Sequence, residues 1–218
     1  MLGKQILPMN IKPHMTVDEL IDAFGESRVY NAGRLYEAFK LYERMLDEDA
    51  TIAVTLAGAM APTGLGGPII KLMEKGFIDF MISTGANLYH DLHFALDLPV
   101  YQGDFRADDV ELRKRGIVRI YDIFIPDDAL LKTDNFLMEV FLSRKLSKPI
   151  STAELHRMIG EAVLTKGKNP ERSIVAQATK YDVPIYTSSP GDSSIGMNRD
   201  VIFRSLSDYR SLWILSLC

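Results

Sequence analysis

Two apolar, β-branched runs that each end in a loop of small residues are the feature that most constrains the fold of this chain. The runs are Thr51–Leu56 and Phe77–Ile82, and the loops after them contain residues 57–67, with four glycines, and residues 83–87, Ser-Thr-Gly-Ala-Asn. A short helix is predicted between them, from Pro68 to Gly76, because proline suits the first helical turn and glycine the left-handed position after the end. Strand, loop, helix, strand and loop make a βαβ unit. Its two loops lie at the carboxyl ends of the strands, where open parallel sheets bind ligands.

The rest of the chain continues the alternation of helices and strands, which predicts an α/β fold with a mainly parallel sheet and a single domain over residues 1–218. The capping boxes Thr16-x-x-Glu19 and Ser151-x-x-Glu154 each predict a helix start, and Gly25 is expected to close the first helix. Further helices are predicted from Asn31, from Asn87 to Leu96, from Asp134 to Leu146 and from Asn169, and further strands at Ile117–Ile125 and Val183–Thr187.

Composition excludes several classes of protein. The only cysteine is Cys218, so neither an internal disulfide nor a multi-cysteine metal site is possible within one chain, and this favours a cytoplasmic protein. A net charge of −4 gives no electrostatic basis for binding nucleic acid. The first residues lack the apolar core of a signal peptide, and no apolar run is long enough to span a bilayer.

A third loop of small residues, 188–196, follows the predicted strand at Val183–Thr187. None of the three loops is a known phosphate motif, because Pro68 stands where a Walker A loop has lysine and the spacing of Gly64, Gly66 and Gly67 breaks the dinucleotide fingerprint. Each loop alone is explained by a structural turn, but three together suggest a shared crevice. Asp192 in the third loop has two interpretations of similar weight: it binds a ribose or a cationic ligand, or it only satisfies backbone N–H groups of its turn.

His90 and His93 share a helix face, but the sequence offers no third ligand at a diagnostic spacing, so we expect no metal site. His90 is better interpreted as a polar residue at the rim of the crevice. No G-x-S-x-G nucleophile elbow is present either.

Three segments together resemble the deoxyhypusine synthase family, and above all its prokaryotic deoxyhypusine synthase-like branch. They are ISTGANLYHDLH, the preceding LAGAMAPTGLGGPIIKLMEKGFIDFMI and the later VPIYTSSPGDSSIGMN, and the similarity extends to about Asn198. The resemblance implies a Rossmann-like fold, a homotetramer and an NAD-dependent aminobutyl transferase. In the family, NAD takes hydride from spermidine, and an active-site lysine receives the butylamine group and passes it to a protein lysine or to a small amine such as putrescine.

The resemblance also implies site residues. Cofactor-binding positions are Thr63, Thr84, Gly85 and Asp192, and His90 occupies a substrate-binding position that is acidic in the eukaryotic enzymes. Met197 replaces a second aspartate that holds a spermidine amine, so polyamine binding is less firmly implied than NAD binding.

The catalytic lysine of the family lies in a GGG-x-x-K segment that this sequence lacks. Residues 199–218 diverge from the family, so we expect a domain that is incomplete at its C-terminus, without its last strands, as after truncation or a frameshift. The first hypothesis is therefore an enzyme of this family, or the major part of one. We expect the given sequence to fail at the transfer step, because the motif lysine is absent from it. The alternative is a non-catalytic module that binds NAD or pairs with a complete subunit.

Overall fold

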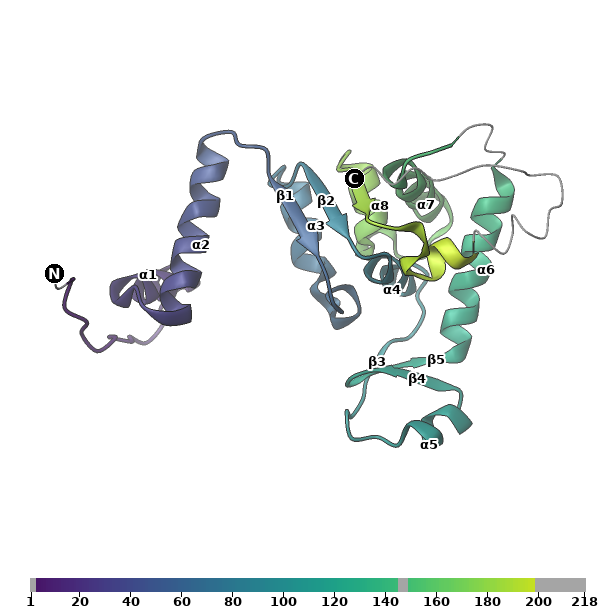
Figure 1. Ribbon diagram of the computed structural model, residues 1–218, viewed down its shortest axis with the longest axis horizontal. Helices are drawn as coiled ribbons and strands as arrows, with labels where there is room; N and C mark the ends of the chain where they lie inside the picture. Colours follow the sequence, from purple (N-terminus) through teal and green to yellow (C-terminus); the bar gives the residue numbers. More distant parts are fainter. Residues whose placement is uncertain (1–2, 145–148, 199–218) are drawn as a thin grey trace. The chain divides into compact units, whose positions relative to one another are not determined.

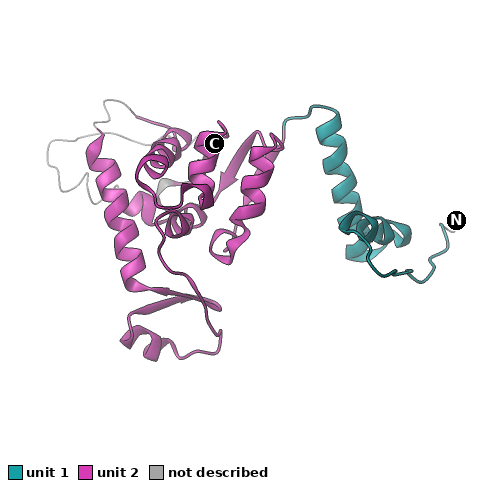
Figure 2. Ribbon diagram, turned by 180° about the vertical axis from the view of Figure 1, so that it is seen from behind, with its two compact units in different colours: residues 1–51 teal, residues 52–218 magenta. Residues whose placement is uncertain are grey.

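The computed structural model describes residues 3–144 and 149–198. The chain forms two compact units, residues 1–51 and residues 52–218 (Figure 2). A single domain over residues 1–218 stays a prediction, since compactness does not show whether either unit folds alone. The tail 199–218, predicted to diverge from the family, lies outside the described residues.

The first unit is built from two helices, α1 (Val17–Ser27) and α2 (Tyr30–Asp47). The predicted capping box is confirmed, because Thr16 Oγ1 accepts from Glu19 N at 3.2 Å and Glu19 Oε2 accepts from Thr16 N at 2.7 Å. The prediction that Gly25 closes α1 is wrong. Gly25 is buried within the helix, where an added Cβ would lie 2.5 Å from the Tyr36 ring, so it is needed for close packing.

Asn31 is not the N-cap of α2, since the helix begins one residue earlier and Val29 occupies the cap position without a side-chain hydrogen bond. The tight connection explains the difference. Arg28 and Tyr30 both have positive φ, at 51° and 50°, so the chain reverses within three residues and starts the helix before the asparagine.

The second unit contains the predicted parallel sheet, with strands β1 (Ala53–Leu56), β2 (Phe80–Ser83) and β6 (Ile185–Thr187) in the order β1-β2-β6. Val54 pairs with Met81, and Met81 pairs with Ile185. The middle strand is covered on both sides by its neighbours, and Met81 is fully buried. The α/β fold class with a parallel sheet flanked by helices is therefore confirmed (Figure 1).

Five helices accompany this sheet: α3 (Gly66–Glu74), α4 (Gly85–Ala95), α6 (Asp127–Ser143), α7 (Thr152–Lys166) and α8 (Ile174–Lys180). The second predicted capping box is confirmed at the start of α7, between Ser151 and Glu154. One continuous core joins sheet and helices, and its fully buried members include Met81, Leu88, Leu92, Leu137 and Ile159.

The segment predicted as one strand, Ile117–Ile125, is a hairpin instead. Strands β4 (Ile117–Ile120) and β5 (Ile123–Pro126) pair antiparallel across a turn in which Tyr121 has a φ of 55°. Both halves have strand-like sequence, so the pattern alone hid the turn between them. The short strand β3 (Tyr101–Gln102) completes a second sheet, in the order β3-β5-β4.

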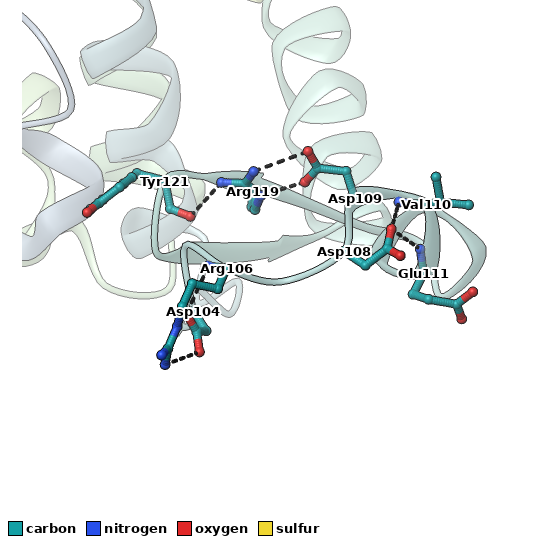
Figure 3. A network of polar contacts seen from close by, with 8 residues as sticks. All are labelled: Asp104, Arg106, Asp108, Asp109, Val110, Glu111, Arg119 and Tyr121. Atoms are coloured by element: carbon teal, nitrogen blue, oxygen red, sulfur yellow. Dashed lines mark hydrogen bonds and ion pairs between the residues drawn. The ribbon is translucent and has the colours of Figure 1, made fainter.

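A short helix, α5 (Asp109–Lys114), packs beside this small sheet. Asp108 caps it by accepting from Val110 N at 2.8 Å, and Arg119 of β4 pairs with Asp109 while donating to the Tyr121 carbonyl at 3.0 Å (Figure 3). These contacts hold α5 against the hairpin, whose second strand leads directly into α6 (Figure 1).

Two predicted helix starts are also wrong. Asp134 does not cap a helix but lies within α6, which begins directly after Pro126. Asn169 precedes only a single 3₁₀ turn, Pro170–Arg172, and α8 begins after Ser173, whose Oγ accepts from Ala176 N at 3.1 Å. Among the described residues, no helix is long and apolar enough to cross a membrane.

Candidate functional site

The loops that follow β1, β2 and β6 lie at one edge of the parallel sheet. Because the three strands are parallel neighbours, their carboxyl ends point the same way. Hydrogen bonds join these segments directly: Thr84 N in the second loop donates to the O of Leu56, the last residue of β1, at 3.1 Å, and Gly85 N donates to Asp192 Oδ2 in the third loop at 2.9 Å. The structure therefore brings together the three segments that the sequence singled out.

Asn87 joins the first loop to the second. Its side chain is 1% exposed, its Oδ1 accepts from Ala61 N at 2.9 Å, and its Nδ2 donates to Thr84 Oγ1 at 3.2 Å. The Thr84 hydroxyl thus accepts one hydrogen bond within the site and keeps its proton for another oxygen. Sequence reasoning did not identify Asn87 as a site residue, and its only signal was an amide in the first turn of a predicted helix.

Asp192 and Gly85 join the third loop to the second. The Asp192 carboxylate accepts from the first N–H of α4, an 11-residue helix whose amino end favours negative charge. Asp192 therefore satisfies a backbone N–H of another loop rather than of its own turn. The interpretation that it serves only its own turn is therefore wrong, and because the residue is exposed, a carboxylate oxygen stays accessible to a ligand, so that ligand binding by Asp192 stays a prediction.

Gly85 sits in a cradle that admits no side chain. An added Cβ would lie 2.3 Å from Asp192 Oδ1 and 2.3 Å from Ser193 Oγ. Ser193 Oγ is itself buried and has no hydrogen-bond partner among the described residues. Since buried hydroxyls are normally paired, this one has capacity for a ligand. Nothing in the sequence distinguished Ser193 from the other serines of its loop.

The polar groups of this edge fit a dinucleotide, which presents ribose hydroxyls and phosphate oxygens. The Thr84 and Ser193 hydroxyls can donate and the Asp192 carboxylate can accept from a ribose, while Gly85 lets the Asp192 and Ser193 side chains pack against the amino end of α4. Thr63 is exposed on an irregular turn, Ala61–Leu65, and its hydroxyl donates to Met60 O at 2.8 Å, which leaves its oxygen free to accept.

His90 and His93 form a hydrogen-bonded pair further along α4. His90 Nδ1 lies 3.1 Å from His93 Nε2, and His93 Nδ1 lies 2.8 Å from Thr133 Oγ1 on α6. Burial lowers the pKa of His93 to about 4, and it lowers the pKa of His90 as well. In residues 3–144 and 149–198, no group of three or more His, Cys, Asp or Glu side chains is placed to hold a metal ion.

Asp134 belongs to a second polar cluster beside this pair. It accepts from Tyr89 Oη at 2.8 Å and from Asn198 Nδ2 at 2.7 Å, and this cluster ties the segment after the third loop to α4 and α6. Burial raises the pKa of Tyr89 above its ordinary value, so the phenol stays protonated. Met197, the departure noted in the sequence, is 55% exposed next to Asn198.

Asp91, between the two histidines, has a structural role. It is fully buried and accepts from Ser173 Oγ at 2.7 Å, from Ile174 N at 2.8 Å and from Val175 N at 3.1 Å. Burial raises its pKa to about 6, although these three donors favour the ionised form.

A cavity of about 550 Å³ is lined by the first, glycine-rich loop but not by the second or the third loop. Gly64, Gly66 and Gly67 line it together with residues of α3, α4 and α8, whereas Thr63, Thr84, Gly85 and Asp192 do not. We place the candidate site at the loops because the Asp192 carboxylate meets the amino end of α4 there and the unpaired Ser193 hydroxyl lies beside it.

Comparison with known proteins agrees with the resemblance seen in the sequence. The deoxyhypusine synthase family model matches residues 19–211. A "Deoxyhypusine synthase-like protein" of Nostoc punctiforme is 45% identical over 202 residues, which are 90% of this chain and 51% of the relative. "Probable deoxyhypusine synthase 1" of Methanosarcina acetivorans is 38% identical over 188 residues, which are 86% of this chain and 57% of the relative.

This chain thus spans about half the length of the curated relatives that it matches. Among solved structures, a protein of Entamoeba histolytica with the provisional name deoxyhypusine synthase superposes with a TM-score of 0.62 at 17% identity. The match covers 92% of this chain and 70% of that one, and at this identity it shows the shared fold. The family model, the two relatives and the fold agree, and the chain belongs to the deoxyhypusine synthase family.

Proposed function

We propose that this chain is the NAD-binding part of an aminobutyl transferase that uses spermidine or a related polyamine as the donor. Family membership supports the aminobutyl-transfer role. The observation that carries the cofactor proposal is the glycine cradle at Gly85, where the amino end of α4, the exposed Asp192 carboxylate and the unpaired Ser193 hydroxyl converge.

NAD, when bound, would supply the hydride acceptor for oxidation of the polyamine. The chain's own residues would bind and orient the dinucleotide: Asp192 would accept from a ribose hydroxyl, and Thr63, Thr84 and Ser193 would hydrogen-bond its oxygens. Gly85 would hold the Asp192 and Ser193 side chains in place at the amino end of α4. His90 would contact the polyamine. A homotetramer, a protein-lysine acceptor and a cytoplasmic location belong to the same proposal, through the family.

A second candidate is a non-catalytic module that binds NAD or pairs with a complete relative. The observation that favours it is the lack of lysine in the three loops, 57–67, 83–87 and 188–196. Lys71 and Lys180, which line the neighbouring cavity, have other contacts: Lys71 Nζ lies 2.6 Å from Glu74 Oε2, and Lys180 Nζ lies 4.9 Å from the centre of the Tyr181 ring. Neither is placed as the nucleophile of the three-loop site.

Titration calorimetry with NAD tests the cofactor proposal directly. Wild type should bind NAD, and Gly85→Ala should weaken binding at least tenfold, because the new methyl group displaces the Asp192 and Ser193 side chains from the amino end of α4. Gly3→Ala is the matched control, since Gly3 has no neighbour within 4 Å and lies far from the loops in sequence. No NAD binding by wild type, or equal affinity in Gly85→Ala, would contradict the proposal.

Mass spectrometry after incubation with NAD and spermidine separates the two candidates. We expect the intact mass of the chain to be unchanged, since the transfer step requires the motif lysine that the sequence lacks. An added aminobutyl group would show that another lysine serves and that the chain is an enzyme by itself. An unchanged mass, together with co-purification of a complete family subunit, would favour the pairing module.

A further inference from the structure

The pair of histidines on α4 belongs to a directional chain of hydrogen bonds. We infer that Thr133 and His93 fix the tautomer of His90, so that His90 presents an unprotonated Nε2 that accepts a hydrogen bond from an amine of the substrate. The identity of the ligand rests on the proposed function, but the tautomer does not. His93 and Thr133 are positioning residues in this scheme, because they act through His90.

The direction of these hydrogen bonds is set at Thr133. Its hydroxyl, which is buried, has one hydrogen and donates it to Ala129 O, one helical turn back, at 2.9 Å. The 2.8 Å contact between Thr133 Oγ1 and His93 Nδ1 therefore needs its hydrogen from the imidazole. His93 is thus protonated on Nδ1, and its Nε2 carries a lone pair.

The same reasoning passes to His90. The 3.1 Å contact between His93 Nε2 and His90 Nδ1 needs one hydrogen, and His93 Nε2 has none to give in the neutral ring. His90 must therefore donate from Nδ1, which leaves its Nε2 unprotonated. In the opposite arrangement the Thr133 hydroxyl would donate to His93 Nδ1 and lose its hydrogen bond to Ala129 O. Only two of the three hydrogen bonds would then form, whereas the arrangement given above forms all three.

The surroundings keep both rings neutral. His93 is fully buried, and the Tyr89 ring meets both imidazoles edge-on, with centroid distances of 5.4 Å. The nearby carboxylates are engaged elsewhere: Asp91 on α4 binds the start of α8, and Asp134 on α6 binds Tyr89 Oη. Within the described part of the chain neither imidazole has an ion pair, and burial lowers the pKa of both.

His90 is placed to use this lone pair. It lies on the helix whose first turn forms the candidate site, about 7.5 Å along the helix axis from Gly85 at roughly 1.5 Å per residue. Its side chain is only partly buried, unlike that of His93. A neutral acceptor with a fixed direction suits an N–H donor of a polyamine, and a protonated ring would repel it.

Nitrogen-15 NMR of histidine-labelled full chain tests the tautomers, because protonated and unprotonated imidazole nitrogens have well separated shifts. We expect both His90 and His93 to carry their hydrogen on Nδ1 at neutral pH. Thr133→Ser should preserve this pattern, whereas Thr133→Val, which removes the acceptor, should shift His93 and then His90 toward the other tautomer. A hydrogen on His90 Nε2 in wild type, or tautomers unchanged in Thr133→Val, would overturn the inference.

Spermidine binding in the presence of NAD tests the ligand. His90→Leu and Thr133→Val should each raise the Kd for spermidine about tenfold, and Thr133→Ser and His90→Gln, which keep an oxygen acceptor, should recover most of the loss. Thermal melts of all variants separate binding from folding. If wild type shows the expected tautomers but binds no spermidine, the proposed substrate is wrong, and the fixing of the His90 tautomer by Thr133 and His93 is still supported. If spermidine binds but His90 and His93 carry their hydrogens on Nε2, the inferred direction of the hydrogen bonds is wrong and the proposed substrate is not affected.

Discussion

Gly160 sets the distance between α7 and α8. An added Cβ would lie 2.0 Å from Thr179 Oγ1 and 2.6 Å from the Val175 carbonyl oxygen, and the backbone oxygen cannot move without shifting α8. Gly160→Ala should therefore lower the free energy of unfolding by about 1 to 3 kcal/mol, the usual cost of overpacking. Urea denaturation measures it.

Gly67→Ala is the control for this prediction. Gly67 lies in α3, and apart from its chain neighbours nothing is within 4 Å of an added Cβ, so alanine there meets no packing clash. Because Pro68 disfavours the helical conformation of a preceding residue that has a Cβ, we expect a loss smaller than that of Gly160→Ala rather than a gain. If the two variants had the same free energy of unfolding, α7 and α8 would be able to move apart at little cost, and Gly160 would not set their spacing.

At the scale of elements, one buried carboxylate joins two helices. Asp91 of α4 accepts from three donors at the start of α8, so Asp91→Ala leaves these groups buried and unpaired. We expect a loss of about 2 to 4 kcal/mol in the free energy of unfolding, given the cost of unsatisfied buried donors. Ser173→Ala removes one donor and one helix cap and should cost about 1 kcal/mol.

Chemical denaturation of both variants and wild type distinguishes these costs. A loss in Asp91→Ala no larger than that in Ser173→Ala would mean that water or another group replaces the carboxylate. Hydrogen exchange at Ile174 and Val175 gives a second measurement, because faster exchange there in Asp91→Ala would locate the damage at the start of α8.

For the whole molecule, buried histidines make stability depend on pH. Burial lowers the pKa of His93 and of His156 to about 4, and His156 Nδ1 is bound to the Ile185 carbonyl at 2.9 Å. Both groups bind protons more readily when unfolded, so their contribution to stability is present above pH 6.5 and is lost as the pH falls toward 4. Between pH 6.5 and pH 5 the contribution of each histidine to the free energy of unfolding therefore falls by about 2 kcal/mol, at about 1.36 kcal/mol per pH unit.

Asp91 acts in the opposite direction. Its folded pKa of about 6 lies above the unfolded value of 3.8, so the folded state holds its proton more tightly, and acidification from pH 6 to 5 returns about 1.4 kcal/mol. The net expectation is a loss of about 2 to 3 kcal/mol between pH 7 and pH 5. Urea denaturation at several pH values measures this loss. If the free energy of unfolding stayed constant or rose as the pH fell from 7 to 5, the assignment of both histidines as neutral in the folded state would be contradicted.

Local sequence signals determined much of this structure. The two capping boxes, the βαβ unit and the three loops after parallel strands were all predicted, because each depends on residues that are close in the sequence. The resemblance to the deoxyhypusine synthase family was confirmed as well. The assignment of Thr63, Thr84, Gly85, Asp192 and His90 to ligands stays a prediction, although their placement at or near the sheet edge supports it.

Only the tertiary structure decided the rest. The order β1-β2-β6 places residues 192 and 85 in contact, and the role of Asn87, the unpaired Ser193 hydroxyl and the Thr133–His93–His90 chain all follow from contacts between distant segments. The hairpin in 117–126 and the mid-helix position of Asp134 were missed because several local patterns were equally compatible with the sequence. Propensity and capping act within a few residues, whereas burial and long-range hydrogen bonds select which side chains meet.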